Sequence, residues 1–199
     1  MAHVENKLIA AGLTPIAGVD EAGRGACAGP LVIAAVILSN PIEGLRDSKE
    51  LSEKQRETYF SQITEMADAI SVIEVSPTEI DERGVHAANL DGMRRAVQKL
   101  SITPAYVLTD GYAIEGMTIP SLAIWKGDQV ANCISAASII AKVTRDRIMV
   151  ELAEKYPQYG LAGHKGYITA SHTKALSEYG VTEIHRRSYS NIAKLLTGN

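Results

Sequence analysis

Short apolar runs alternate with segments of helical spacing along the first part of this chain. β-Branched runs at 16–20 and 31–38 are joined by a glycine-containing turn, which predicts two adjacent antiparallel strands. A helix is expected over 48–67, where Ser48 as a cap precedes apolar residues at helical spacing. The apolar run at 69–76 predicts the next strand.

Helix and strand signals alternate in the middle of the chain. The sequence SPTE at 76–79 predicts a capping box with proline at the first helical position, and 86–100 continues as helix. Strands are expected at 105–110 and 119–128, and each ends in an acid. From about 129 to 156 the pattern predicts one long helix with a small-residue face that allows close packing. The small residues are Ala131, Ser135, Ala136, Ser138 and Ala141.

The order of these elements favours an α/β fold. Strands come first, helices and strands alternate in the middle, and helices end the chain, so we expect a mixed sheet flanked by helices. With 199 residues, of which 46% are hydrophobic, the chain is long enough to bury a real core. Since no repeat, low-complexity tract or linker marks a boundary, residues 1–199 are expected to form one domain.

Charge is unevenly distributed around a net value of −3. Residues 142–199 carry nine Lys and Arg against five Asp and Glu, whereas the preceding residues carry an excess of acids. An acidic body with a basic tail suits a protein that binds metal with one part and a polyanion with the other. Solvated helix faces would give the same distribution without any such function.

The two cysteines and the absence of targeting signals point to a reducing compartment. Cys27 and Cys133 are too few for a disulfide framework and lie among small residues, where cysteine serves as an apolar filler. A redox pair between them is the alternative. The N-terminal residues lack a signal-peptide pattern, and no run approaches the ~20 apolar residues of a membrane span. We therefore expect a cytoplasmic protein that does not bind membranes.

Acidic residues stand at the ends of three expected strands. Asp20 and Glu21 follow the first apolar run, and Asp110 and Asp128 end two later ones. If these strands lie side by side with the same polarity, the four carboxylates converge. Like charges a few ångströms apart force proton uptake or demand a cation, and oxygen ligands without His or Cys favour Mg²⁺ or Mn²⁺. Two such ions are the usual arrangement for in-line hydrolysis of a phosphodiester.

Each acid also has an ordinary structural explanation. A strand-terminal Asp beside a glycine commonly serves a turn, which applies to the two later acids. Asp20 and Glu21 are costly to bury without a partner, and a salt bridge from Arg24 would supply one in a protein indifferent to metal. Asp146 is a rival fourth ligand. In a continuous helix it lies about 27 Å along the axis from Asp128, so we expect it to form a surface ion pair with Arg145, Arg147 or their neighbours instead.

A Gly-Arg-Gly turn at 23–25 follows the first two acids. Its glycines allow the backbone to approach a sugar or phosphate closely. The stretch lacks the Gly-Lys-Ser/Thr ending of a nucleotide-binding phosphate loop and joins two strands rather than a strand and a helix. A tight hairpin that needs positive φ is the alternative, but it does not explain the arginine.

Several linked motifs occur in order over nearly the whole chain. They are DEAGRG at 20–25 with GPLVIAAVIL, GLRDSKELSEKQRE at 44–57, DG at 110–111, KGD with SAASIIAKVTRDRIM at 126–149, and GYITASHTKALSEYG with HRRSY at 166–189. Together they closely resemble ribonuclease HII, the type 2 ribonuclease H. The resemblance implies a ribonuclease H-like fold in which residues 157–199 form a substrate-binding helical extension.

The resemblance implies an endonuclease that cuts the RNA strand of RNA–DNA hybrids. It would also nick 5′ of a single ribonucleotide embedded in duplex DNA, leaving 3′-hydroxyl and 5′-phosphate ends, with Mg²⁺ or Mn²⁺ as cofactor. The metal-binding catalytic residues would be the four acids: Asp20, Glu21, Asp110 and Asp128. Gly23, Arg24 and Gly25 would sense the ribose 2′-hydroxyl, Lys49 would contact a phosphate, and Tyr167 would stack on the deoxyribose that follows the ribonucleotide. A tyrosine that merely covers the core is the alternative for Tyr167.

The implied partners are RNA–DNA hybrid and ribonucleotide-containing duplex DNA. Four basic residues of the last third can lie along the duplex backbone, and binding should then weaken with salt. They are Lys165, Lys174, Arg186 and Arg187. The tail NIAKLLTGN contains no aromatic clamp-binding peptide. We therefore expect no stable attachment to a replication clamp, no obligate protein partner, and a monomer.

Some positions depart from the family pattern. Ile168 stands where many relatives have proline, and Tyr189 stands where phenylalanine is common. His86 receives no role, and His164 and His172 are expected at the surface.

Three other functions fit parts of the sequence. Ribonuclease HIII shares the carboxylates but usually carries an N-terminal substrate-binding domain, and the first acid here lies at residue 20. A metal-stabilised nucleic-acid-binding module without turnover would gain nothing from acids that face phosphate. A Mg²⁺-dependent phosphatase acting on small molecules would not need the Gly-Arg-Gly turn or the basic tail.

Overall fold

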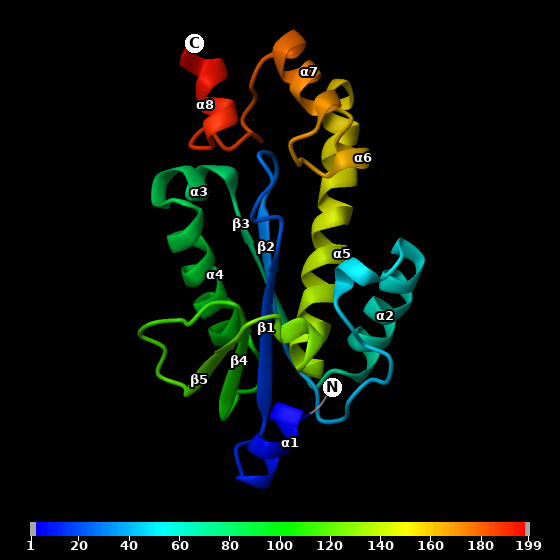
Figure 1. Cartoon of the computed structure of the whole chain (residues 1–199), viewed down its shortest axis with the longest axis vertical. Helices are drawn as coiled ribbons and strands as arrows, with labels where there is room; N and C mark the ends of the chain where they lie inside the picture. Colours follow the sequence, from blue (N-terminus) through cyan, green and yellow to red (C-terminus); the bar gives the residue numbers. More distant parts are fainter. Residues whose placement is uncertain (1–2, 198–199) are drawn as a thin grey trace.

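A five-stranded sheet of mixed direction forms the centre of the computed structural model, which describes residues 3–197 (Figure 1). Its strands are β1 (Ile16–Ala22), β2 (Leu31–Ile37), β3 (Ala69–Val75), β4 (Tyr106–Asp110) and β5 (Ser121–Ile124). Across the sheet they run in the order β3-β2-β1-β4-β5. Strand β2 pairs antiparallel with β1 and β3, whereas β4 pairs parallel with β1 and β5. The expected antiparallel first pair and the mixed α/β sheet are confirmed.

Helices cover both faces of the sheet and extend beyond its ends (Figure 1). In chain order they are α1 (His3–Ala10), α2 (Glu53–Met66), α3 (Pro77–Arg83), α4 (Val85–Lys99), α5 (Asn132–Lys155), α6 (Leu161–His164), α7 (Ala170–Tyr179) and α8 (Ser190–Thr197). Short 3₁₀ turns occur at η1 (Ser48–Glu50), η2 (Gly127–Gln129) and η3 (Pro157–Tyr159). Within residues 3–197, none of these helices combines the length and apolar character that a bilayer crossing requires.

The side chains of β2 contribute to two hydrophobic cores. All seven residues of the strand are buried, as expected for an apolar run covered on both faces. Leu31, Ile33, Ala35 and Ile37 pack with α4 on one face. The alternate residues Val32, Ala34 and Val36 pack with α2 and α5 on the other.

Helix α5 packs closely against β1 because Gly18 has no side chain. A Cβ at Gly18 would lie 2.2 Å from the carbonyl carbon of Cys133. The expected small-residue face is buried here: Ala131, Ser135, Ala136, Ser138 and Ala141. This close approach brings the turn before α5 next to β1.

The helix expected over 48–67 begins later, at Glu53. The side chain of Asp47 caps the short turn η1 instead. Ser52 and Gln55 then form a reciprocal capping box for α2. A second cap within the same polar stretch therefore divides the predicted helix into two elements.

The strand expected over 119–128 ends at Ile124. Lys126 adopts a left-handed conformation with φ of 55°, and Gly127 starts η2. Asp128 consequently lies in a turn that leads into α5, not at the end of a strand.

The capping box expected at 76–79 is only half formed. Ser76 accepts a hydrogen bond from the backbone N–H of Glu79, with Pro77 at the first helical position. The Glu79 carboxylate instead forms an ion pair with Arg95, in which Oε1 lies 2.7 Å from Nη1. An ion pair on the helix surface has replaced the second capping bond.

The C-terminal extension packs against the distal end of α5, at the opposite end of the molecule from α1 (Figure 1). Its core includes Cys27 and Ala28 from the loop between β1 and β2. Cys27 and Cys133 are buried free thiols in separate clusters, so they do not form the alternative redox pair. The last two residues of the tail, 198–199, lie outside the described residues.

Candidate metal centre and active site

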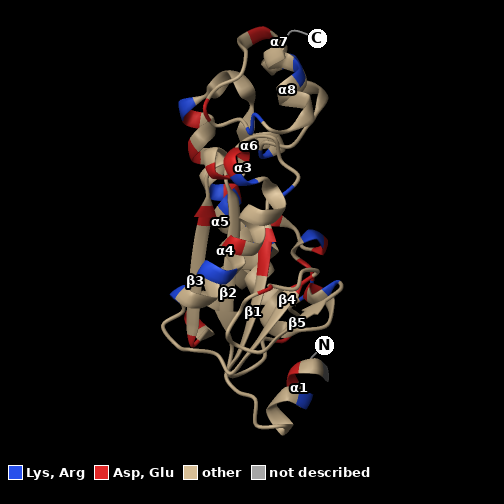
Figure 2. Cartoon of the chain, turned by 90° about the vertical axis from the view of Figure 1, so that its left-hand side faces the viewer, with Lys and Arg blue, Asp and Glu red and all other residues tan. Residues whose placement is uncertain are grey.

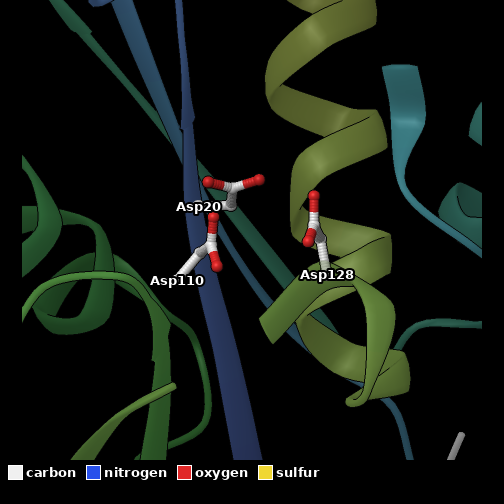
Figure 3. A group of neighbouring side chains, drawn as sticks. All are labelled: Asp20, Asp110 and Asp128. Atoms are coloured by element: carbon white, nitrogen blue, oxygen red, sulfur yellow. The ribbon is translucent and has the colours of Figure 1, made fainter. Parts of the chain in front are cut away.

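Three carboxylates from three elements converge beside the sheet (Figure 3). Asp20 lies near the end of β1, Asp110 ends β4, and Asp128 lies in η2. One oxygen from each lies within 4.8 Å of the others. Parallel pairing places the carboxyl ends of β1 and β4 together, and the close packing of α5 on β1 brings η2 to the same place.

Few hydrogen bonds orient the three carboxylates. Asp20 Oδ1 accepts a bond from the backbone N–H of Glu21, with N and O 2.7 Å apart. Asp110 Oδ1 accepts a bond of the same length from the N–H of Gly127. Each bond orients one oxygen, Oδ1 of Asp20 and Oδ1 of Asp110.

Burial destabilises the ionised form of these acids. Burial raises the pKa of Asp20 well above its usual value, and the neighbouring Glu21 and Asp110 raise it further. Burial, followed by repulsion from Asp110 and Asp47, raises the pKa of Asp128 to about 6. The cluster therefore favours either bound protons or a cation.

Lys49 supplies only partial compensation. Its Nζ lies 3.8 Å from Asp128 Oδ2 and 3.9 Å from Asp47 Oδ1, but its side chain is 76% exposed. Burial lowers the pKa of Lys49, yet these acids outweigh that effect and raise it overall. One exposed ammonium does not neutralise a buried cluster of acids. Since every candidate ligand is a carboxylate oxygen, the cluster fits a hard divalent cation such as Mg²⁺ or Mn²⁺.

Glu21 lies beside the three acids but outside their group. Its Oε2 is buried and has no hydrogen-bond partner among the described residues. Burial raises the pKa of Glu21 to about 7, while the positive charge of the nearby Arg24 opposes the shift. Asn89 is fully buried, and neither amide atom has a hydrogen-bond partner among residues 3–197. A buried polar atom without a partner costs about 1–3 kcal/mol, so this corner suits a ligand.

Two adjoining hollows form a trough over these residues. The first, of about 280 Å³, is lined by Glu21, Asp47, Lys49, Asp110, Gly111, Tyr112, Trp125, Lys126, Asp128 and Gln129. The second, of about 650 Å³, is lined by Glu21, Arg24, Gly25, Gly84, Val85, Ser188 and Tyr189. Because Glu21 lines both, the trough runs from the acids past the Gly-Arg-Gly turn to the C-terminal extension.

The two glycines of the turn are held for different reasons. Gly23 has φ of 90°, and a Cβ there would lie 1.8 Å from Nε of the buried Arg145. Gly25 is exposed, does not have positive φ, and would bring a Cβ no closer than 3.8 Å to Tyr167. The fold therefore requires glycine at 23, whereas it leaves room for a side chain at 25.

Arg24 packs on an aromatic ring and forms no salt bridge with the acids among the described residues. Its Cζ lies 4.7 Å from the ring centroid of Tyr112, and its Nη1 donates to the Tyr112 hydroxyl. Among the described residues no carboxylate lies within 4 Å of its guanidinium, so the expected alternative of a salt bridge is wrong. The carbonyl of Arg24 accepts bonds from Arg186 Nη1 at 3.1 Å and the Tyr189 hydroxyl at 2.5 Å.

Tyr167 stands beside the Gly-Arg-Gly turn. It is 40% exposed, and the guanidinium carbon of Arg145 lies 5.5 Å from its ring centroid. Its ring edge is the nearest neighbour of Gly25. The expected site residues thus lie in or around one trough, although they come from segments far apart in the sequence.

Comparison with known sequences identifies the family to which this arrangement of residues belongs. The profile of Ribonuclease HII matches residues 17–192. A Ribonuclease HII of Acidothermus cellulolyticus is 56% identical over 194 residues, which cover 96% of this chain and 63% of the relative. The chain belongs to the ribonuclease HII family. A second family member, from Parafrankia sp., is 54% identical over 96% of this chain and 81% of its own length. Members of this family are metal-dependent endoribonucleases, which is the enzyme class expected from the sequence.

Solved structures confirm the ribonuclease H-like fold. The ribonuclease H2 of Pyrococcus horikoshii matches 92% of this chain and 97% of its own, with a TM-score of 0.78 at 32% identity. The Archaeoglobus fulgidus ribonuclease HII, solved in complex with PCNA, matches 89% of this chain and 96% of its own with the same TM-score at 28% identity.

Two expectations about side-chain exposure in this family member are wrong. Arg186, expected along the duplex backbone, is fully buried and donates to the carbonyls of Gly29 and Arg24. His172, expected at the surface, is also fully buried. His86, which received no role, packs edge-on against Tyr112 with ring centroids 5.7 Å apart.

The basic tail is less basic at the surface than its composition suggests. Arg145 and Arg186 are buried, while Lys142 pairs with Asp146 at 2.7 Å and Arg147 with Glu57 at 2.5 Å. The surface ion pair expected for Asp146 is therefore present. Acidic and basic residues are interspersed over the helices, the C-terminal extension included (Figure 2).

Sequence reasoning missed several residues of the trough. Asp47 precedes Ser48-Lys49 in a pattern typical of a cap, which signalled its position but not its contact with the acids. Asn89 is a polar residue on the buried face of α4, and that position was a usable signal. Trp125 is 81% exposed directly before the Lys-Gly-Asp motif, and an exposed tryptophan beside acids was the third.

Proposed function

We propose that this chain is a divalent-metal-dependent endoribonuclease that hydrolyses the RNA strand of RNA–DNA hybrids. It also nicks 5′ of a single ribonucleotide in duplex DNA and leaves 3′-hydroxyl and 5′-phosphate ends. One observation carries the proposal: the converging acids Asp20, Asp110 and Asp128 share a trough with the Gly-Arg-Gly turn. Membership of the ribonuclease HII family supports it.

The acids are the proposed metal ligands. Asp20, Glu21, Asp110 and Asp128 would together hold the divalent cations, Mg²⁺ or Mn²⁺. When bound, two such ions activate a water and stabilise charge on the leaving oxygen. The all-oxygen donor set and the unpartnered Oε2 of Glu21 support this assignment. Lys49, exposed beside Asp128, would contact a phosphate of the cleaved strand.

The Gly-Arg-Gly turn is the proposed sensor of the ribose 2′-hydroxyl. Gly25 is exposed, and among the described residues neither its N–H nor its C=O has a hydrogen-bond partner. A bare peptide group of this kind can approach a hydroxyl that a side chain at 25 would block. Gly23 keeps the turn in shape, and Arg24 is held on Tyr112 and stands beside the acids.

The extension at 157–199 is the proposed second half of the substrate surface. Tyr167 would stack on the deoxyribose after the ribonucleotide, since its exposed ring stands next to Gly25. Lys165, Lys174 and Arg187 would approach the duplex backbone; Arg186 is excluded by burial. We propose a monomer without an obligate protein partner.

A nicking assay tests this function. The substrates are an end-labelled duplex with one ribonucleotide, the all-DNA duplex of the same sequence, and an RNA–DNA hybrid, each in Mg²⁺ and in Mn²⁺. The proteins are the wild type, Asp110→Asn, and Asp146→Asn as a control, because Asp146 is an acid paired with Lys142 outside the trough.

Wild type and Asp146→Asn should nick both ribonucleotide-containing substrates and spare the DNA duplex, whereas Asp110→Asn should lose about a thousandfold or more of the rate. Binding without cleavage in both metals would leave a nucleic-acid-binding module and refute the proposal.

A further inference from the structure

Three histidines outside the acid cluster meet behind Tyr167. The rings of His164 and His172 stack with centroids 4.4 Å apart and an interplanar angle of 17°. Nε2 of His172 lies 3.3 Å from Nε2 of His185. His172 and His185 are 0% and 1% exposed, and within residues 3–197 no carboxylate lies within 4 Å of their ring nitrogens. Buried polar nitrogens of this kind are normally hydrogen-bonded, so the partner of each ring nitrogen has to be identified.

The backbone fixes which nitrogen of His185 carries the proton. Its Nδ1 lies 3.1 Å from the backbone N–H of Thr182. A backbone N–H can only donate, so Nδ1 must be unprotonated. The proton of neutral His185 is therefore on Nε2, which faces His172.

This assignment passes on to the next ring. Because Nε2 of His185 donates, Nε2 of His172 must accept, and the proton of His172 is on Nδ1. That nitrogen lies 3.0 Å from the carbonyl oxygen of Tyr167, which can only accept. Cys27 Sγ also lies near this Nδ1, but at the longer distance of 3.7 Å, and its thiol can donate to the carbonyl oxygen of Gly166 at 3.5 Å. The hydrogen bonds thus run from Thr182 through both histidines to the backbone of Tyr167.

His164 completes the support from the other side. Its Nδ1 accepts a bond from the N–H of Gly166 at 3.2 Å, and its Nε2 donates to the carbonyl of Tyr159 at 2.8 Å. The carbonyl of Gly166 in turn accepts bonds from the N–H groups of Cys27 and Ala28, at 3.0 and 3.2 Å. The histidines therefore hold the backbone that links Tyr167 to the loop of the Gly-Arg-Gly turn.

We infer that His172 and His185 are positioning residues that hold Tyr167 against the Gly-Arg-Gly turn and so set the enzyme's preference for a deoxyribose after the ribonucleotide. The inference rests on the function proposed above for Tyr167. Burial lowers the pKa of both histidines, that of His185 to about 4, which keeps both rings neutral near pH 7. Neutral rings are required, because a second proton on either would place two donors face to face.

A merely structural role makes a different prediction. Histidines that only stabilise the extension would affect all substrates alike when replaced. Positioning residues for Tyr167 act selectively, because only a substrate with a deoxyribose in that place uses the tyrosine.

The test compares His172→Leu with His172→Asn. Asparagine keeps an N–H donor near the position of Nδ1, whereas leucine keeps none. Values of kcat and KM are measured on duplex DNA with one ribonucleotide and on a uniform RNA strand paired with DNA. We expect His172→Leu to lose about tenfold in kcat on the first substrate, the equivalent of about 1.4 kcal/mol, and less than about twofold on the second. His172→Asn should recover most of the loss.

A double variant and a spectrum separate the outcomes. In a Tyr167→Ala background, His172→Leu should cause no further selective loss. Long-range ¹H–¹⁵N spectra of the wild type at pH 7 should show His172 protonated at Nδ1 and His185 at Nε2. Charged rings or the opposite tautomers would overturn the inference.

The kinetic outcomes distinguish this inference from the proposal on which it rests. If Tyr167→Ala is selective but His172→Leu reduces activity on both substrates equally, only the positioning role fails. If Tyr167→Ala is itself unselective, the proposed stacking role of Tyr167 fails and the positioning role fails with it. The Asp110→Asn variant tests the proposed metal centre, and its result does not depend on the roles of Tyr167 or the histidines.

Discussion

Two groups of buried charges lie near the end of β1, and the protein satisfies them differently. The arginines Arg145 and Arg186 are completely buried without a carboxylate within 4 Å among the described residues. Arg145 donates to the carbonyls of Pro30 and Ala28, and Arg186 to those of Gly29 and Arg24. One nitrogen of each guanidinium, Nη1 of Arg145 and Nη2 of Arg186, has no partner among the described residues. Burial lowers the pKa of Arg145 to about 10, which still leaves it charged at neutral pH.

The acids lack comparable partners. Asp20 and Asp110 each accept one backbone bond, and Oε2 of Glu21 accepts none from the described residues. Several backbone carbonyls hold each arginine in the loop, whereas the acids accept at most one backbone bond each and lie close enough to share a cation. Removal of an arginine should therefore harm the fold, and removal of an acid should harm the chemistry.

The largest expected effect is on catalysis. Asp20→Asn should lower the nicking rate by about a thousandfold or more, because it removes one of the proposed metal ligands. Without divalent metal, however, its free energy of unfolding at pH 8 should rise by about 1–2 kcal/mol, because the cost of burying the Asp20 carboxylate disappears, together with its repulsion by Glu21 and Asp110. Rates come from the labelled-duplex assay and stabilities from urea unfolding. A less stable Asp20→Asn would contradict the view that the acids are strained.

The opposite result is expected for the arginines. Arg145→Met should lower the free energy of unfolding by about 3 kcal/mol, because two buried carbonyls lose their donor. Its affinity for Mn²⁺ should remain that of the wild type, since Arg145 does not contact the three acids. Urea unfolding and metal titration on the same preparation check both statements. If Arg145→Met were as stable as the wild type but bound Mn²⁺ more weakly, the view that this arginine serves the fold and not the metal site would be wrong.

The sheet and the convergence of the acids could be predicted from the sequence for physical reasons. Apolar periodicity determines which residues face a core, and parallel strands bring their carboxyl ends together. For Asp128 the result was right but the reason was wrong. It reaches the cluster from a turn, because Gly18 allows α5 to approach β1 closely.

The buried arginines and histidines could not be predicted in this way. Arg186 donates to the carbonyl of Gly29, which is 157 residues away in sequence. His172 depends on His185 from a separate loop. No local sequence pattern identifies such distant partners. A prediction from sequence therefore places a charged or titratable side chain at the surface, where most such residues lie.

The pH dependence of stability sharpens the comparison further. Burial raises the pKa of Glu21 to about 7 in the folded protein, so its contribution is favourable below its ordinary pKa near 4.5 and is lost as pH rises through 7. Glu21→Gln should therefore gain stability relative to the wild type between pH 4.5 and 8, by on the order of 2 kcal/mol. Urea unfolding across this range measures the difference. A constant difference would mean that Glu21 is not strained.

The smallest expected effect on stability comes from Gly25. Gly25→Ala should change the free energy of unfolding by less than about 0.5 kcal/mol, because its Cβ meets only ordinary contacts. Gly23→Ala should cost several times more, because its Cβ collides with Arg145. Yet Gly25→Ala should reduce cleavage at a ribonucleotide at least about tenfold, if the bare backbone meets the 2′-hydroxyl. Unchanged cleavage by Gly25→Ala would remove the turn from substrate recognition.

Metal binding itself tests the central claim most directly. Mn²⁺ binding to the wild type, Asp110→Asn and the paired surface acid Asp146→Asn would be measured by calorimetric titration at pH 8. The three converging carboxylates predict that the wild type and Asp146→Asn bind alike and that Asp110→Asn loses at least about tenfold in affinity. Equal binding by Asp110→Asn would show that the converging acids are not the metal centre.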